Sequence, residues 1–192
     1  IQPNIKHMTQ INGRLSLLRE AMIKAGVSAC IIPGTDPHAS EYIAGYWKER
    51  DWISGFDGSA GTVALTLEQA GLWTDSRYFL QGADQLKGTD IKLMKQGLPE
   101  TPEIIPWLSV ELKKGDKVAV NAEMFSINSF SVMKTELALN DIELVSIDFM
   151  KDVWTDRPEL PKNPFFVFDK NDVHHLPGTI AIDNFYFDYL PE

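Results

Sequence analysis

The sequence has one cysteine, an excess of acidic over basic residues and no long hydrophobic run, and each of these excludes a class of protein. Cys30 cannot form a disulfide within the chain, and its apolar neighbours favour a buried thiol. No apolar stretch approaches the roughly 20 residues of a membrane-spanning helix. The net charge of −9 argues against nucleic acid and anionic lipid as partners, because both are bound by clustered lysine and arginine.

The composition otherwise is that of a globular protein. A chain of 192 residues with 44% hydrophobic side chains can bury the core of one domain and carry an extension. No charged-then-apolar signal pattern opens the sequence, which favours a cytoplasmic location. The dipeptide His7–Met8 is common at cloning junctions, so residues 1–8 are expected to be a vector-derived or disordered leader.

Periodicity along the chain indicates alternating helices and strands. Apolar residues recur every three or four positions over 9–25 and end at Gly26, which is typical of an amphipathic helix. The apolar run 27–32 is typical of a strand buried on both faces. Two β-rich runs, 62–67 and 71–73, flank a short polar turn and predict an antiparallel hairpin. Further segments are expected to be helices (38–47, 77–86, 102–112, 126–139) and strands (91–95, 117–121, 142–147).

This order of elements predicts an α/β fold in three layers, with helices on both faces of a mixed sheet of about six strands. The domain is expected to span 9–154. Three prolines between positions 158 and 164 predict a semi-rigid linker over 155–164. Residues 165–192 are left as an unassigned extension, with strand-forming runs at 165–168 and 179–189.

Arg77 is the candidate site residue, because the second hairpin strand stops just before it. Thr74, Asp75 and Ser76 can cap a helix that begins near Arg77 and thereby give its side chain a defined direction. A guanidinium so placed could bind a substrate carbonyl or carboxylate. By residue type alone, an exposed arginine paired with Asp75 or Glu103 is the more common interpretation.

Other motifs predict structure rather than chemistry. The glycines of 55–61 precede a strand, whereas nucleotide-binding loops precede a helix, so a tight turn with Asp57 as its cap is favoured. Two sets of possible metal ligands, Asp36 with His38 and Glu41 and the pair His174–His175, lack a recognised spacing and predict no metal site. No nucleophile motif is present, so the residues suggest no catalytic group.

Separated blocks of the sequence closely resemble the amino-terminal domain of the cytosolic-type Xaa-Pro aminopeptidases, also called aminopeptidase P. They occur in the family's order, and the resemblance covers about 15–164. The blocks are Ile32–Pro33 with Asp36, His38 and Ser40–Ala44, then Ser54–Thr62, Trp73–Gln81, Leu93–Gly97 and Val153–Pro158.

The resemblance implies the creatinase-type amino-terminal fold, a six-stranded mixed sheet of ribonuclease H-like topology. It implies a parent metallopeptidase that removes the residue preceding proline, with two metal ions, usually manganese, in a carboxy-terminal domain beyond this chain. The fragment itself would then be non-catalytic, hold no metal, gate the substrate and pack on its own catalytic domain. Arg77 matches the family arginine that reaches toward the peptide, which favours substrate binding as its role.

Two alternatives stay open. The chain could be a free-standing binding or assembly module of the same fold, and it could form a homodimer through apolar surface normally covered by other domains. Residues 170–192 do not align with the family's next domain, so nothing is assigned to His174 or His175.

Overall fold

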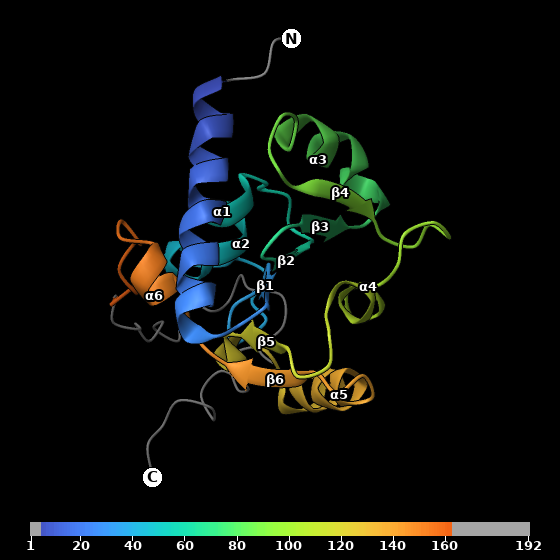
Figure 1. Ribbon diagram of the computed structural model, residues 1–192. Helices are drawn as coiled ribbons and strands as arrows, with labels where there is room; N and C mark the ends of the chain where they lie inside the picture. The colour runs from blue at the N-terminus through green and yellow to red at the C-terminus, as the bar shows by residue number, and fades with distance from the viewer. Residues whose placement is uncertain (1–4, 163–192) are drawn as a thin grey trace, which may run out of the picture. The chain divides into compact units, whose positions relative to one another are not determined.

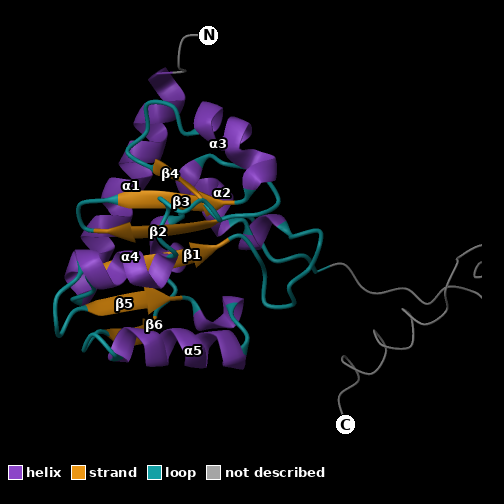
Figure 2. Ribbon diagram, turned by 90° about the vertical axis from the view of Figure 1, so that its right-hand side faces the viewer, coloured by secondary structure: helices purple, strands orange, loops and turns teal. Residues whose placement is uncertain are grey.

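A six-stranded sheet organises the part of the computed structural model that is described, residues 5–162 (Figure 1). The strands lie in the order β4-β3-β2-β1-β5-β6. β2 is antiparallel to both of its neighbours, and the other pairs are parallel, as Figure 2 shows. The mixed sheet predicted from the sequence is confirmed. The strands are β1 Ala29–Pro33, β2 Thr62–Thr66, β3 Ala70–Thr74, β4 Lys92–Lys95, β5 Lys117–Val120 and β6 Glu143–Ser146.

Helices cover both faces of the sheet. α1, α2, α6 and the residues that flank α3 contribute side chains to the core on one face, and α4 and α5 contribute to the core on the other. Within residues 5–162, three 3-10 turns lie in the connections, at Gly45–Trp47, Ser76–Tyr78 and Ala122–Met124. The helices are α1 Ile5–Ala25, α2 Glu49–Ser54, α3 Phe79–Gln85, α4 Ile104–Glu111, α5 Ile127–Ala138 and α6 Met150–Val153.

The two cores follow from the alternation of side chains along β1. Cys30 and Ile32 point to the core under α1, whereas Ala29 and Ile31 point to the core under α4 and α5. The strand is therefore buried on both faces, as its unbroken apolar sequence predicts. Burial raises the pKa of the Cys30 thiol, so Cys30 is a small apolar residue of the core and not a nucleophile.

α1 packs by the predicted stripe of apolar residues. Ile11, Leu15, Leu18 and Met22 are fully buried, and Gly26 ends the helix with a φ of +66°, a conformation that glycine adopts without strain. The helix begins at Ile5 rather than near Thr9. Residues 5–8 therefore continue the helix, although the sequence pattern placed them in a leader.

The helix expected over 38–47 is wrong, because local hydrogen bonds favour a turn there. The Asp36 carboxylate accepts hydrogen bonds from the backbone N–H groups of His38 and Ser40, both at 2.9 Å. Ala39 has a φ of +52°, which a right-handed helix excludes. Only Gly45–Trp47 forms a 3-10 turn, and the helix follows later, as α2.

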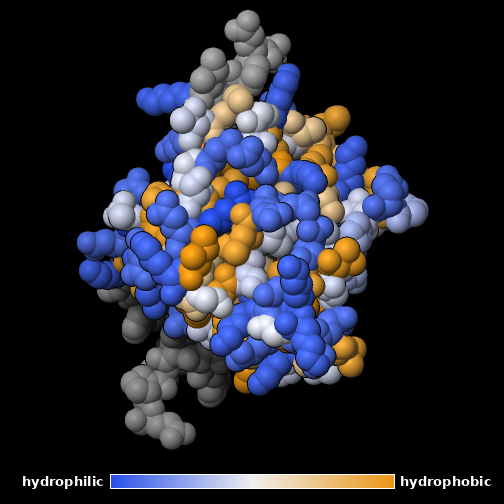
Figure 3. All heavy atoms as spheres, viewed as in Figure 1, coloured by the Kyte–Doolittle hydropathy of each residue, from blue (hydrophilic) through white to orange (hydrophobic). Residues whose placement is uncertain are grey.

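The chain divides into a compact unit over 1–160 and a second unit over 161–192. The predicted extension, 165–192, lies outside the described residues, and the linker boundaries stay a prediction. Among the helices of 5–162, none has both the length and the apolar character to cross a membrane. Figure 3 shows hydrophilic residues over most of one face, with hydrophobic ones in small groups between them.

Candidate functional site

The candidate site lies at one edge of the sheet, where β1 and β3 end and β2 begins. Pro33 pairs with Thr62, and Thr62 pairs in turn with Trp73. The connections that leave these residues therefore meet at the same edge. In sheets with parallel strands, this carboxyl-end edge is where loops gather functional side chains.

Arg77 stands at this edge, on the 3-10 turn that follows β3. The Asp75 carboxylate caps the turn by accepting the Arg77 backbone N–H at 3.0 Å, and it also accepts from Arg77 Nε at 2.9 Å and Nη2 at 2.7 Å. The hydrogen bond with Asp75 raises the pKa of Arg77, and the same contact lowers the pKa of Asp75. The ion pair that the sequence offered as the ordinary interpretation is thus present, with Asp75 and not Glu103 as the partner.

The pair with Asp75 leaves much of the guanidinium available. The Arg77 side chain is 66% exposed. Asp75 occupies the edge formed by Nε and Nη2, so the N–H groups of Nη1 and the second one of Nη2 can donate to another acceptor. Arg77 can therefore bind a carbonyl or carboxylate oxygen while it stays paired with Asp75.

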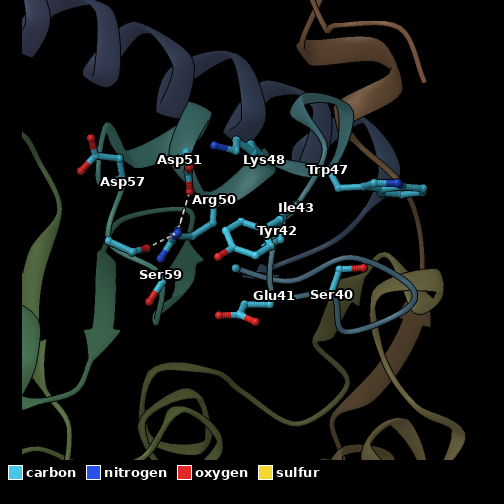
Figure 4. Close-up of a pocket in the computed structure, with 12 residues that line it drawn as sticks. Ser40, Glu41, Tyr42, Ile43, Trp47, Lys48, Arg50, Asp51, Asp57 and Ser59 are labelled. Carbon is cyan, nitrogen blue, oxygen red and sulfur yellow. Dashed lines mark hydrogen bonds and ion pairs between the residues drawn. The ribbon is translucent and has the colours of Figure 1, made fainter. Parts of the chain in front are cut away.

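A pocket of about 370 Å³ opens at the same edge, and Figure 4 shows its lining. Its aromatic wall is made by Tyr42 and Trp47, and Lys48, Arg50 and Asp51 come from the start of α2. The remaining lining residues are Gly34, Ser40, Glu41, Ile43, Asp57, Gly58 and Ser59. The pocket combines aromatic surface with both signs of charge, so it can bind a ligand that is partly apolar and partly charged.

Arg50 fixes the shape of this pocket. Its side chain is only 3% exposed, and its Nη2 donates to Asp51 Oδ1 and to the Gly58 carbonyl, both at 2.6 Å. An added Cβ on Gly34 would lie 3.0 Å from Arg50 Cζ and 2.7 Å from the Gly61 carbonyl oxygen. Glycine at position 34 therefore lets the backbone approach the buried guanidinium closely.

The turn predicted over 55–61 connects the pocket to Arg77. Ser59, which lines the pocket, bonds through its Oγ to the Tyr78 hydroxyl at 2.6 Å, and this bond lowers the pKa of Tyr78. Asp57 does not cap its own turn as expected. Its carboxylate accepts hydrogen bonds from the side-chain amides of Gln81 and Gln85, both at 2.7 Å, because α3 lies close enough to reach it.

The first set of possible metal ligands is not brought together. Asp36 is buried and turns its carboxylate to backbone N–H groups, His38 is exposed, and Glu41 lines the pocket. Burial pushes the pKa of Asp36 upward, but hydrogen bonds from Ser40 and His38 outweigh this and lower it. Among residues 5–162, no three His, Cys, Asp or Glu side chains could hold a metal ion. His174 and His175 lie outside the described residues.

The sequence analysis missed the pocket residues Lys48, Arg50 and Asp51 and a buried pair between Glu49 and Arg157. The sequence did contain a signal for the pocket residue Arg50, because a run of charged residues lies between Trp47 and Trp52. For Arg157 the signal was the block Val153–Pro158, but the three prolines between positions 158 and 164 instead suggested a linker.

Comparison with known proteins identifies the class to which this fold belongs. Residues 14–152 match the creatinase/prolidase N-terminal domain family. Because the match covers most of the chain, the chain belongs to this family. An Xaa-Pro aminopeptidase of Streptococcus thermophilus, 18% identical with a TM-score of 0.55 over 76% of this chain and 98% of its own, shares the fold.

More similar relatives specify which branch of the family it resembles. The Xaa-Pro aminopeptidase ApepP of Drosophila melanogaster is 40% identical over 87% of this chain and 28% of its own. Xaa-Pro aminopeptidase 2 of Rattus norvegicus is 38% identical over 82% of this chain and 23% of its own. The crystal structure of X-prolyl aminopeptidase from Caenorhabditis elegans, described as a cytosolic enzyme with a di-nuclear active site, matches with a TM-score of 0.76 and 34% identity over 83% of this chain and 28% of that one.

These matches confirm the resemblance and the fold expected from the sequence blocks. The chain spans about a quarter of the length of the curated relatives named here.

Proposed function

We propose that this chain is the non-catalytic, substrate-gating domain of an enzyme that releases the N-terminal residue from Xaa-Pro peptides. The observation that carries the proposal is Arg77, held in a fixed direction at the sheet edge of a domain whose relatives are named Xaa-Pro aminopeptidases. Asp75 lowers the conformational freedom of the guanidinium before a peptide arrives, which reduces the entropy lost on binding.

The hydrolytic chemistry belongs to another domain in this proposal. The Caenorhabditis elegans enzyme is described as having a di-nuclear active site, and the described residues of this chain have no group that fits a metal ion. Two divalent ions, manganese by the family resemblance, would activate water and polarise the scissile carbonyl when bound in that domain.

Arg77 would contribute binding and orientation. Its free N–H groups can donate to a peptide carbonyl or to the terminal carboxylate of a short peptide, and its permanent charge strengthens such bonds. Proton transfer is not assigned to it, because a guanidinium stays protonated at physiological pH. A cytoplasmic location is proposed for the enzyme by analogy with the Caenorhabditis elegans protein.

The test is the substitution Arg77→Ala in the longer protein that would contain this domain, assayed with Xaa-Pro peptides and added manganese. We expect kcat/KM to fall roughly 10- to 100-fold, the value of one or two hydrogen bonds to a charged group. Metal content, measured by elemental analysis, should stay unchanged because Arg77 holds no metal.

Lys114→Ala is the matched control. Lys114 is also an exposed cation paired with a carboxylate, Asp141, at 3.0 Å, but it precedes β5 and so lies at the opposite edge of the sheet. The substitution Lys114→Ala should therefore leave kcat/KM unchanged. Kinetics of Arg77→Ala that match the wild type would remove Arg77 from the substrate site.

A further inference from the structure

Arg157 lies within the segment that the sequence predicts to be a linker, yet it is among the most extensively bonded side chains described. Its side chain is 7% exposed. Nη2 donates to Glu49 Oε1 at 2.6 Å, Nε donates to the Tyr46 carbonyl at 2.8 Å, and Nη1 lies 3.5 Å from Asp148 Oδ2. Glu49 and Asp148 are themselves almost fully buried, at 3% and 10% exposure of their side chains. A flexible linker would not bury a charge among three separate elements, because desolvation is compensated only by fixed partners.

Aromatic rings surround the same guanidinium. Arg157 Cζ lies 3.7 Å from the ring centre of Tyr46 and 5.7 Å from that of Trp154, distances typical of cation–π contacts. Trp154 in turn stacks on Trp52 of α2, with ring centres 5.3 Å apart and planes 21° from parallel. The segment is thus attached by stacking as well as by charge.

Pro158 extends this attachment by one residue. A Cβ added to Gly45 would lie 3.4 Å from Pro158 Cγ, so the proline ring lies beside the 3-10 turn at the open side of Gly45. Trp154 and Arg157 also keep backbone hydrogen bonds, from Trp154 N to the Met150 carbonyl and from Arg157 N to the Trp154 carbonyl, each 3.1 Å long.

We propose that Arg157 anchors the segment 154–158 to the domain, so that residues 155–158 are held by the domain although the sequence places them in a linker. We call this set, Arg157 with Glu49, Asp148 and Tyr46, the Arg157 anchor. The consequence is mechanical: the chain from Trp154 to Pro158 is fixed beside α2 and does not move as part of a linker that starts at Thr155. The inference stands on these contacts and does not depend on the role proposed for Arg77.

Hydrogen–deuterium exchange of the 192-residue chain tests the anchor. In Arg157→Ala, amides of residues 150–158 should exchange at least about tenfold faster than in the wild type, because removal of one partner leaves buried charges uncompensated. Amides of β1 should keep their wild-type rates and serve as the internal reference. Glu49→Gln, which retains an acceptor oxygen but loses the charge, should give a smaller increase in the same peptide.

Lys151→Ala is the matched control, since Lys151 is a mostly exposed cation that forms an ion pair with the same Asp148 at 3.7 Å. It should change exchange over 150–158 by less than about threefold, as for an exposed ion pair. If Arg157→Ala does not fold, Arg157→Lys retains the charge without the forked geometry and should still accelerate exchange. Unchanged exchange over 150–158, or an equal acceleration in β1, would overturn the proposal.

Discussion

Two arginines of this chain show how position decides what a guanidinium does. Arg77 is mostly exposed and shares one carboxylate, so solvent and salt screen its ion pair and most of its donors stay available. Arg157 is buried between two carboxylates and three aromatic rings, and its Nε and Nη2 donate hydrogen bonds within the fold. The first is suited to bind a ligand and the second to hold the structure.

Asp75 has two separable tasks at the residue scale, and the substitution Asp75→Ser distinguishes them. Serine can still cap the turn by accepting the backbone N–H of Arg77, but it cannot hold the guanidinium with two oxygens. If the proposed function is correct, kcat/KM should fall roughly two- to fivefold, the range of an exposed ion pair. Steady-state kinetics of the longer protein measure this.

A double-mutant cycle shows whether Asp75 acts through Arg77. In the Arg77→Ala background, Asp75→Ser should have no further effect, because the side chain it positions is already gone. An equal loss in both backgrounds would mean that the carboxylate acts independently of Arg77.

Glu49 makes the stability of the domain depend on pH. Burial raises the pKa of Glu49 from 4.5 to about 7; Arg157 opposes this rise and Asp148 adds to it. The folded state therefore binds the proton more tightly than the unfolded state. The contribution of Glu49 to the free energy of unfolding is therefore complete below about pH 4.5 and is lost as the pH rises through about 7.

Glu49→Gln should remove this dependence. Between about pH 5 and pH 8, the free energy of unfolding of the wild type should fall relative to that of the variant, as measured by urea denaturation. Glu143→Gln changes an exposed carboxylate paired with Lys117 at 3.2 Å and should follow the wild type. Parallel curves for Glu49→Gln and the wild type would contradict the assignment.

At the scale of elements, replacing two glycines by alanine should change the stability of the chain in opposite directions. Gly13 lies inside α1 with open space around it, whereas Gly34 follows β1 and is pressed against the Gly61 carbonyl and Arg50. Gly13→Ala should stabilise the chain by about 0.5–1 kcal/mol through helix propensity. Gly34→Ala should destabilise it by about 1–3 kcal/mol, because neither neighbour can move freely.

Urea denaturation of both variants tests this pair, with Gly13→Ala as the matched control for the added methyl group. If Gly34→Ala had wild-type stability, the loop and Arg50 would relax without cost, and the conclusion that Arg50 fixes the shape of the pocket would be wrong.

At the scale of the whole molecule, the order of elements was the predictable part. Helix and strand periods are local properties, so the buried strand, the hairpin and most of the later elements were found near their true positions. The helix predicted over 38–47 is absent because the Asp36 carboxylate accepts hydrogen bonds from backbone N–H groups of this segment. The spacing of apolar residues carries no information about such local hydrogen bonds.

The sequence by itself determined the α/β architecture, the burial of Cys30 and the turn that orients Arg77, because each depends on neighbours within a few positions. Only the tertiary structure decided that Asp57 binds side chains of α3, that Arg50 shapes a pocket, and that Arg157 bonds to Glu49 and Tyr46. Arg157 reaches Glu49 across 108 positions of sequence and Tyr46 across 111. Such contacts exist only once the sheet has brought its loops to one edge, which no pattern along the chain specifies.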